Sequence, residues 1–286
     1  FVYLASYPKD EDIEFSKLKD LWSSEGLVQP TDSKSVEEVT EVYVNELISS
    51  SLVIVFNEIG GREKSCKIHD LVHDFCSIKA RKEKLFDLTS SIVLSSSSDL
   101  MLRGMSLDDE HLPSNGIPFL FNPEKKNPSA RHLLSLQIYF TREVLPYNFH
   151  LRHLRLIKML DLEGVDLTDC LLNEIGMLVH LRCLIIWTKA EALPRSFSNL
   201  CNLETLKVSN YGSNIVLSPV IWSFAKLRHV EMDSCSVFVA DIDKPTELEN
   251  LTTLRFLKLS SSVKDIFKRF PNLGTLEFKM DYSAAE

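Results

Sequence analysis

The sequence lacks the segments by which several classes of protein are recognised. No stretch of 18 apolar residues is present, so no membrane-spanning helix is predicted. The chain starts at Phe1 without a charged segment leading an apolar run, which argues against a signal peptide. Its 6 cysteines form no C-x-x-C pair and have no histidines at zinc-binding spacing. Reduced thiols are therefore expected, rather than a zinc site or a disulfide framework.

Positive charge is also scarce. The chain has 32 Lys and Arg residues against 40 Asp and Glu, and a formal net charge of -8 at pH 7. Acidic residues outnumber basic ones within residues 1–84 as well. Because neutralisation of phosphates dominates binding to nucleic acids, this balance argues against a nucleic-acid partner.

Motifs for catalysis are missing too. No serine stands in a G-x-S-x-G elbow, and no cysteine has a paired base at a recognisable spacing. The phosphate-binding loop G-x-x-x-x-G-K-[ST] does not occur. We therefore expect no enzymatic activity, no catalytic residue and no metal site in this chain.

What is present suits two domains. The length of 286 residues and a hydrophobic content of 44% are typical of globular proteins of that size. We expect a first domain over residues 1–88, a linker with an irregular first repeat over 89–130, and a repeat domain over 131–286. The predicted fold class is an α+β winged-helix domain followed by an α/β leucine-rich-repeat solenoid.

The first domain reads as helices followed by a two-stranded wing and a last helix. One helix is expected to end at Gly26, and another to begin at Ser35 with Glu38 completing a capping box. Residues 52–56 and 65–68 predict a β-hairpin. A winged-helix module has this order of elements, and many such modules bind DNA, but the acidic balance argues against that function.

The last helix of this domain follows the second strand directly. Its apolar residues Leu71, Val72, Phe75 and Ile78 are expected to point inward. His73, one turn after His69, is expected on a solvated face, with a polar contact like that of His69 as the alternative.

Three stretches of the first domain resemble a known family. Residues 1–10 (FVYLASYPKD), residues 17–28 (KLKDLWSSEGLV) and Ile68-His69-Asp70 are similar to the winged-helix motifs of plant nucleotide-binding leucine-rich-repeat immune receptors. The similarity is greatest to the coiled-coil type that includes the solanaceous late-blight resistance proteins. Ile68 stands where the family has the Met of its Met-His-Asp motif. The family's phosphate-binding loop lies upstream of these motifs.

The resemblance assigns roles to the strand-to-helix corner. It implies that His69 reaches the β-phosphate of ADP held by the neighbouring nucleotide-binding domain, and that Ile68 and Asp70 belong to the same switch. A helix N-terminus favours an anion, and Asp70 is expected to cap the backbone N–H groups of its helix. The residue types alone also fit an ordinary cap-region histidine beside an N-terminal acid.

The second domain is marked by a repeated L-x-x-L-x-L pattern. Seven copies have central residues at 136, 160, 184, 206, 230, 257 and 276, separated by 19 to 27 residues. This spacing predicts leucine-rich repeats stacked into a curved parallel sheet. Side chains alternate along each strand, so the residues between the leucines are expected on the concave face. These residues are Asp161, Glu163, Ile185, Trp187, Lys207, Ser209, Glu231, Asp233, Lys258, Ser260, Glu277 and Lys279.

Trp187 and Ile185 are the apolar members of that set. Because Trp is enriched at binding hot spots, Trp187 is a candidate anchor for a protein partner. The alternative is that Trp187 covers a neighbouring loop of the same solenoid.

The resemblance implies the autoinhibition and effector-recognition portion of an ADP/ATP-controlled plant immune receptor. Its partners would be the receptor's own nucleotide-binding domain, a pathogen effector or a partner receptor, in the cytoplasm or the nucleus. ADP or ATP is expected in the whole receptor and no cofactor in this chain. The chain is expected to be monomeric and the whole receptor to oligomerise on activation. The alternative function is a protein-binding adaptor of the ubiquitin-ligase type without a nucleotide switch, which would need an F-box-like segment.

Overall fold

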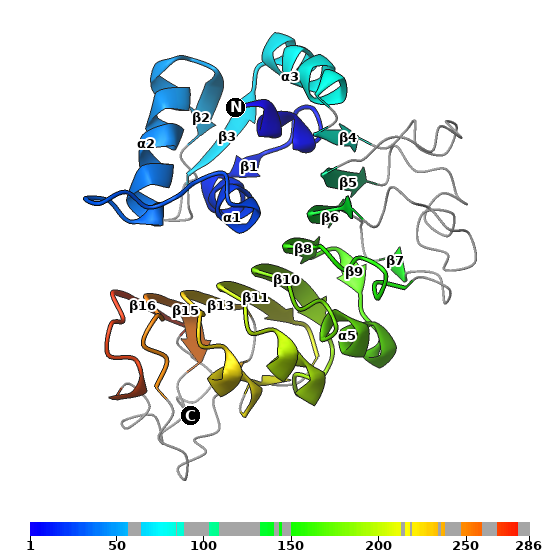
Figure 1. Cartoon of the computed structure of the whole chain (residues 1–286), viewed down its shortest axis with the longest axis vertical. Coiled ribbons are helices and arrows are strands. Elements are labelled where there is room, and N and C mark those ends of the chain that lie inside the picture. The colour runs from blue at the N-terminus through cyan, green and yellow to red at the C-terminus, as the bar shows by residue number, and fades with distance from the viewer. Residues whose placement is uncertain are drawn as a thin grey trace, which may run out of the picture.

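The computed structural model describes residues 1–56, 64–83, 85–88, 103–108, 132–139, 143–144, 150–212, 215–217, 219–233, 236–237, 247–258 and 268–279. Within them, a small N-terminal domain lies on the inner side of an arc of parallel strands (Figure 1). The helix α5 lies on the outer side of the arc. No helix in these ranges combines the length and hydrophobicity needed to cross a bilayer.

The N-terminal domain is a winged helix. A three-stranded antiparallel sheet has the order β1-β3-β2, and three helices pack around it. The elements are the 3-10 helix η1 (Val2–Ser6), β1 (Ile13–Glu14), α1 (Phe15–Glu25), α2 (Val36–Ser49), β2 (Val53–Phe56), β3 (Ser65–Ile68) and α3 (Asp70–Lys82).

The ends of two helices form as the sequence predicts. Gly26 follows α1 in the left-handed conformation, with φ of 79°, where a residue without a Cβ carries no steric penalty. Ser35 caps α2: its hydroxyl accepts from the Glu38 N–H at 3.3 Å, and the Glu38 carboxylate accepts from the Ser35 N–H at 2.7 Å. The capping box is therefore confirmed.

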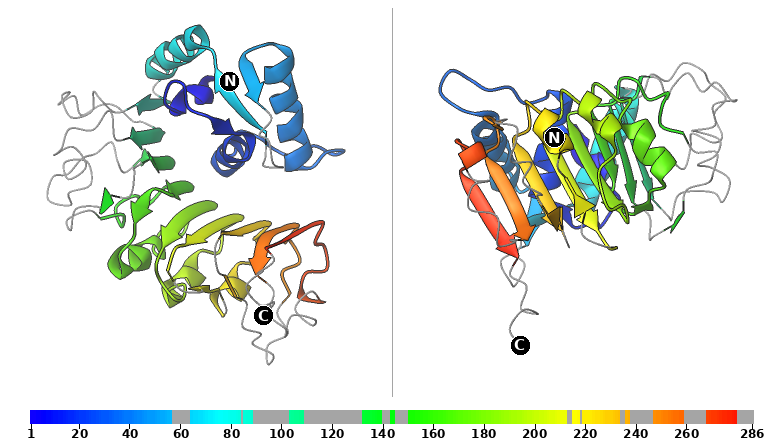
Figure 2. Two further views of the ribbon diagram at one scale, coloured as in Figure 1. Left: turned by 180° about the vertical axis from the view of Figure 1, so that it is seen from behind. Right: turned by 90° about the horizontal axis from the view of Figure 1, so that it is seen from below.

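The second domain is a leucine-rich-repeat solenoid with a nine-stranded parallel sheet. The sheet runs through β4 (Phe86–Leu88), β5 (Gly104–Asp108), β6 (Ser135–Tyr139), β8 (Met159–Leu162), β10 (Cys183–Thr188), β11 (Thr205–Asn210), β13 (His229–Asp233), β15 (Thr253–Lys258) and β16 (Thr275–Lys279). Two further pairs, β7 (Glu143–Val144) with β9 (Val165–Asp166) and β12 (Ile215–Val216) with β14 (Ser236–Val237), flank it. The outer side carries α5 (Asp169–Ile175), η3 (Arg195–Asn199) and η4 (Val220–Ser223), as the further views show (Figure 2).

The solenoid sheet starts earlier than expected. Strand β4 lies within the range predicted for the winged helix, and β5 within the range predicted for a linker, yet both pair in the sheet of the repeats. Of these two strands, only β5 lies within the irregular first repeat that was expected over residues 89–130. Short strands with weak leucine patterning are hard to recognise, because neighbouring strands supply much of their stabilisation.

Phenylalanine and asparagine side chains of several repeats stabilise the outer side of the stack. Phe197 and Phe224 are fully buried there. Asn202, Asn250 and Asn272 each donate from their side chain to a backbone carbonyl of the preceding repeat, at 2.7 to 2.9 Å. These bonds satisfy carbonyls that a loop would otherwise leave unpaired, and they fix the distance between successive turns.

The register of β15 corrects one predicted repeat. Leu254 pairs with Val230 and with Leu276, so Leu254 is the central residue and not Leu257. The sequence from Leu251 to residue 259 contains two overlapping L-x-x-L frames, and the structure uses the first. A register shift follows Leu254, and Phe256 has φ of 59° there. The repeat spacing is therefore more even than the sequence pattern indicated.

Candidate functional site

The strand-to-helix corner places His69 at the N-cap of α3. Its Nδ1 accepts a hydrogen bond from the Leu71 N–H at 3.3 Å, and the side chain is exposed. In the neutral ring the proton is then on Nε2, so Nε2–H is a donor available to solvent. This corner can offer one hydrogen-bond donor beside a positive helix end.

Asp70 does not cap the helix, and that prediction is wrong. His69 is the capping residue, and Asp70 is an exposed acid of the first turn. Its charge still stabilises the helix end through the dipole. Ile68 is 8% exposed and packs in the core of the winged helix, so it positions the corner and offers no polar group.

Helix α3 is oriented differently from the sequence prediction. Leu71, Phe75 and Ile78 are 73%, 57% and 70% exposed, whereas His73 is buried and its Nε2–H donates to the Tyr7 carbonyl at 3.0 Å. The inward face of the helix is therefore made of His73, Cys76 and Ala80. The helical period was read correctly, but small and polar residues face inward because η1 packs closely against this side.

The inner face of the solenoid carries three rows of side chains, set by the parallel register. The middle row contains the predicted residues Asp161, Ile185, Lys207 and Glu231, with Arg255 in the place that was assigned to Lys258. That prediction is corrected by the frame shift of β15. The middle row is Gln137, Asp161, Ile185, Lys207, Glu231 and Arg255, and the front row is Ser135, Met159, Cys183, Thr205, His229 and Thr253.

The front row was not predicted from the sequence. Its residues precede the central leucine of each repeat, and the period of two along a strand would have placed them on the same face as the middle row. This row and the middle row meet the winged-helix domain, so the concave face of these strands is occupied by the chain itself.

The centre of this interface is apolar. Met159, Cys183 and Ile185 of the solenoid belong to the same buried cluster as Leu18 and Leu21 of α1. Burial raises the pKa of the Cys183 thiol well above its ordinary value. Helix α1 is therefore buried on two sides, by its own domain and by the solenoid.

A buried acid ties the two domains together at one end of α1. Glu25 accepts from the Tyr3 hydroxyl and from the Ser135 hydroxyl, both at 2.6 Å. Burial raises the pKa of Glu25, although the two hydrogen bonds oppose the shift. Lys158 and Arg182 of the solenoid also donate to backbone carbonyls at the end of this helix.

Ion pairs cross the interface along the length of α1. Lys17 pairs with Glu163 at 2.5 Å, and Asp20 pairs with Lys207 at 2.9 Å. Glu231 lies 3.6 Å from the same lysine. Burial alone would lower the pKa of Lys207, but Asp20 and Glu231 outweigh it and raise that pKa above its ordinary value.

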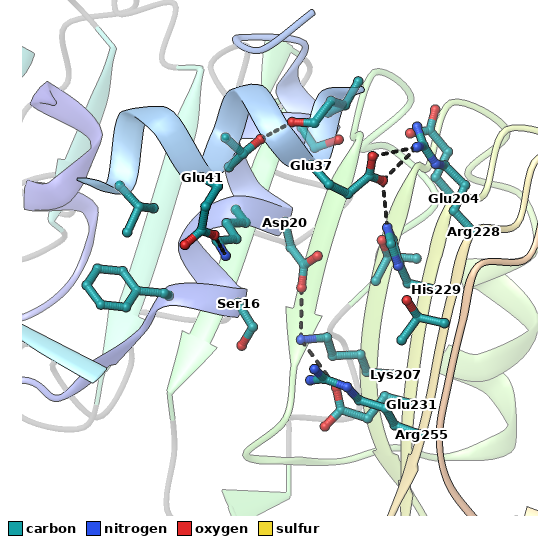
Figure 3. A pocket seen from close by; sticks show the side chains of 18 of the residues that line it. Ser16, Asp20, Glu37, Glu41, Glu204, Lys207, Arg228, His229, Glu231 and Arg255 are labelled. Carbon is teal, nitrogen blue, oxygen red and sulfur yellow. Dashed lines mark hydrogen bonds and ion pairs between the residues drawn. The ribbon is translucent and has the colours of Figure 1, made fainter. Parts of the chain in front are cut away.

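A clamp at the rim joins α2 to β13. The Glu37 carboxylate lies 2.6 Å from Arg228 and 3.1 Å from His229 (Figure 3). The hydrogen bond from His229 and the charge of Arg228 lower the pKa of Glu37 to about 2. Between the clamp and the Asp20–Lys207 pair lies a cavity of about 450 Å³, lined by α1, α2, β11, β13 and β15.

Trp187 lies in the third row of the inner face, two residues after Ile185 along β10. It is beyond the area that the winged-helix domain covers. Its ring meets Tyr211 edge to face at 5.1 Å, and Lys189 lies over the Tyr211 ring at 4.8 Å. Asp166 pairs with Lys189 at 3.0 Å and accepts from the Tyr211 hydroxyl. Trp187 therefore packs within the solenoid, which is the alternative weighed for it, while its partly exposed surface remains beside the interface.

The remaining predicted residues lie at the far end of the sheet. Asp233 is half-buried opposite Ser209, and Glu277 pairs with Arg255 at 3.3 Å. The backbones of Lys258 and Lys279 are paired. Ser260 lies outside the described residues. In the described part of the chain, no cluster of three or more His, Cys, Asp or Glu residues could hold a metal ion.

Comparison with known proteins agrees with both domains. A disease resistance protein winged helix domain matches residues 7–76, and a leucine-rich repeat region matches residues 132–283. A putative disease resistance protein of Arabidopsis thaliana is 29% identical over 96% of this chain and 31% of its own length. A putative late blight resistance protein homolog of Solanum demissum is 28% identical over 96% of this chain and 22% of its own length.

The chain therefore spans less than a third of the curated relatives that it matches here. Among solved structures, a leucine-rich repeat protein of Leptospira interrogans superposes with a TM-score of 0.48 and 19% identity, over 70% of this chain and 56% of that one. With a winged helix and leucine-rich repeats matched in order along most of its length, the chain belongs to the plant disease resistance proteins.

Proposed function

We propose that this chain is the autoinhibition and effector-recognition portion of an immune receptor controlled by ADP and ATP. The observation that supports the proposal is the docking of the winged-helix domain on the inner face of the solenoid. The strands that would bind a partner are covered by α1 through Ile185, Lys207 and Glu163. In this arrangement the receptor is inactive, because the winged-helix domain covers the recognition surface and is itself bound by it.

The nucleotide belongs to the domain that precedes the winged helix in the whole receptor. A group of this chain suited to contact it is the exposed His69 at the N-terminus of α3, and the sequence has no lysine-bearing phosphate loop. His69 Nε2–H would donate to a phosphate oxygen, and the helix end would add a favourable field. The bound nucleotide would supply the energy difference between the two states, and this chain would sense which nucleotide is bound.

Activation is then a shift between two populations. A pathogen effector or a partner receptor that binds the solenoid better when the winged helix has left would favour the open state. The open receptor would oligomerise through surfaces that include the freed winged helix. We place this activity in the cytoplasm or the nucleus and assign the chain no catalysis of its own.

Charge reversal at the Asp20–Lys207 pair tests the proposal. In the full receptor, Lys207→Asp should separate the domains and cause cell death without an effector, and the second change Asp20→Lys should restore the resting state. Lys189→Asp is the matched control, because it breaks the ion pair with Asp166 on the solenoid without touching α1. A silent Lys207→Asp receptor, or a double variant as active as the single one, would refute the proposal.

A further inference from the structure

One acid of the interface, Asp161, forms no ion pair within 4 Å among the described residues, although Lys17 lies close enough to attract it. Asp161, in the middle row on β8, is fully buried under the winged-helix domain. Its Oδ1 accepts from the Glu163 N–H at 3.1 Å. Its Oδ2 has no hydrogen-bond partner among the described residues.

The charged groups around Asp161 come from both domains. The cations are Lys17 of α1, which pairs with Glu163, and Lys207 of β11, which pairs with Asp20. The Tyr7 hydroxyl, after η1, and the Cys183 thiol on β10 are buried on the same side, and Asp20 and Glu163 add negative charge. Both nearby lysines therefore already have a carboxylate, and Asp161 is an additional negative charge in the interface.

Burying a carboxylate that lacks a full set of partners is unfavourable, because its hydration is lost without replacement. On a separated solenoid the inner face would meet water, and Asp161 would be hydrated. We infer that Asp161 opposes docking of the winged-helix domain and lowers the stability of the closed state. Formation of the closed state is then coupled to the uptake of a proton. This inference rests on the docked arrangement used in the proposed function, and it adds a residue that limits closure.

The direction of the Asp161 pKa shift agrees with this inference. Burial raises the pKa of Asp161 from 3.8 to about 6, although Lys17 opposes the shift. A raised acid pKa means that the closed state binds more protons, so closure is favoured as pH falls through about 6 and weakened as pH rises above it. Since one pKa unit corresponds to a factor of ten, the closed state loses at most about a hundredfold in population at neutral pH.

Cys183 offers a reporter of opening within the same chain. It is 1% exposed and lies under α1, whereas Cys201 is exposed on the outer side of the solenoid. The full chain is pulsed with N-ethylmaleimide, and both thiols are quantified by peptide mass spectrometry. The ratio of the two labelling rates removes the intrinsic pH dependence of alkylation, because opening exposes both thiols to the same solvent.

Asp161→Asn keeps the Oδ1 acceptor and the size of the side chain while removing the charge. At pH 7.5 it should slow the labelling of Cys183 about tenfold relative to Cys201. Glu163→Gln is the matched control: it removes a paired acid next to the same strand, and it should leave the ratio unchanged or raise it. The inference fails if Asp161→Asn does not slow labelling, or if both variants slow it equally.

The unmodified chain gives a second test that needs no variant. Its labelling ratio should rise at least threefold between pH 5 and pH 7.5, and a flat profile would refute the inference. Burial also raises the pKa of Glu25 and Glu231, so the part due to Asp161 is the rise that Asp161→Asn abolishes. If labelling behaves as expected while Lys207→Asp receptors stay silent, the proposed function falls and the inference stands.

Discussion

Replacing Glu37 by Gln should open the interface at its rim. Glu37 is in the first turn of α2 and joins it to Arg228 and His229 of the solenoid. Gln keeps one acceptor for Arg228 but carries no charge. Arg228 would then be left without a charged partner from the winged-helix domain, and His229 would lose its carboxylate partner, while the interior of both domains stays intact.

The expected effect is a weakening of closure by about 1–2 kcal/mol. The lowering of the Glu37 pKa from 4.5 to about 2 sets an upper limit near 3 kcal/mol. The side chain is 42% exposed, so screening by water reduces that limit by about half. A loss of this size changes the open population by about 5- to 30-fold.

The rate of maleimide labelling at Cys183 relative to Cys201 measures this change. Glu41→Gln is the matched control, because Glu41 lies one turn further along α2 and pairs with Lys19 inside the winged helix. Glu37→Gln should raise the ratio 5- to 30-fold and Glu41→Gln should not. Because the pKa of Glu37 is lowered, its contribution is complete above pH 4.5 and lost as pH falls toward 2. Equal ratios for both variants would show that the clamp does not hold the domains together.

Three further predictions follow from particular residues. Gly26→Ala should lower the free energy of unfolding by about 1 kcal/mol, because φ of 79° disfavours any side chain. Urea denaturation measures this change, and an unchanged midpoint of unfolding would contradict the prediction. Trp187→Ala should lower thermal stability through loss of the edge contact with Tyr211, worth about 0.5–1.5 kcal/mol beyond the lost area, and unchanged melting would identify it as a pure contact residue. In the full receptor, Asp70→Val should give cell death without an effector, as should His69→Ala; silence of both would remove the switch role of this corner.

The sequence predicted the architecture because the signals were local and repeated. Seven leucine triads, a capping box at Ser35 and a glycine at position 26 each act through neighbours a few residues away. The frame of the sixth repeat was wrong because Leu254 belongs to two overlapping patterns. Only pairing with Val230 on the neighbouring strand decides between them, and pairing is not a local property.

The site was predicted less well than the fold. Four residues of the middle row were predicted, but Gln137 and Arg255 were not, and the partner of the row is α1 of the same chain, which no periodicity could reveal. The inward face of α3 was also misread, because His73 is buried by a bond to the Tyr7 carbonyl, 66 residues away along the chain. Contacts between segments far apart in the chain decide which face of a helix or sheet is buried. The periodicity of a single sequence shows which residues share a face, but not which face is covered.

The shared core between the two domains has a consequence for fragments. Met159, Cys183 and Ile185 are part of the solenoid by sequence but are shielded from water by α1. A solenoid produced from β4 onward, without η1 to α3, would present these side chains as an exposed apolar patch. Such a truncated product should self-associate. Binding observed with it would reflect the absence of the winged-helix domain and not a natural partner.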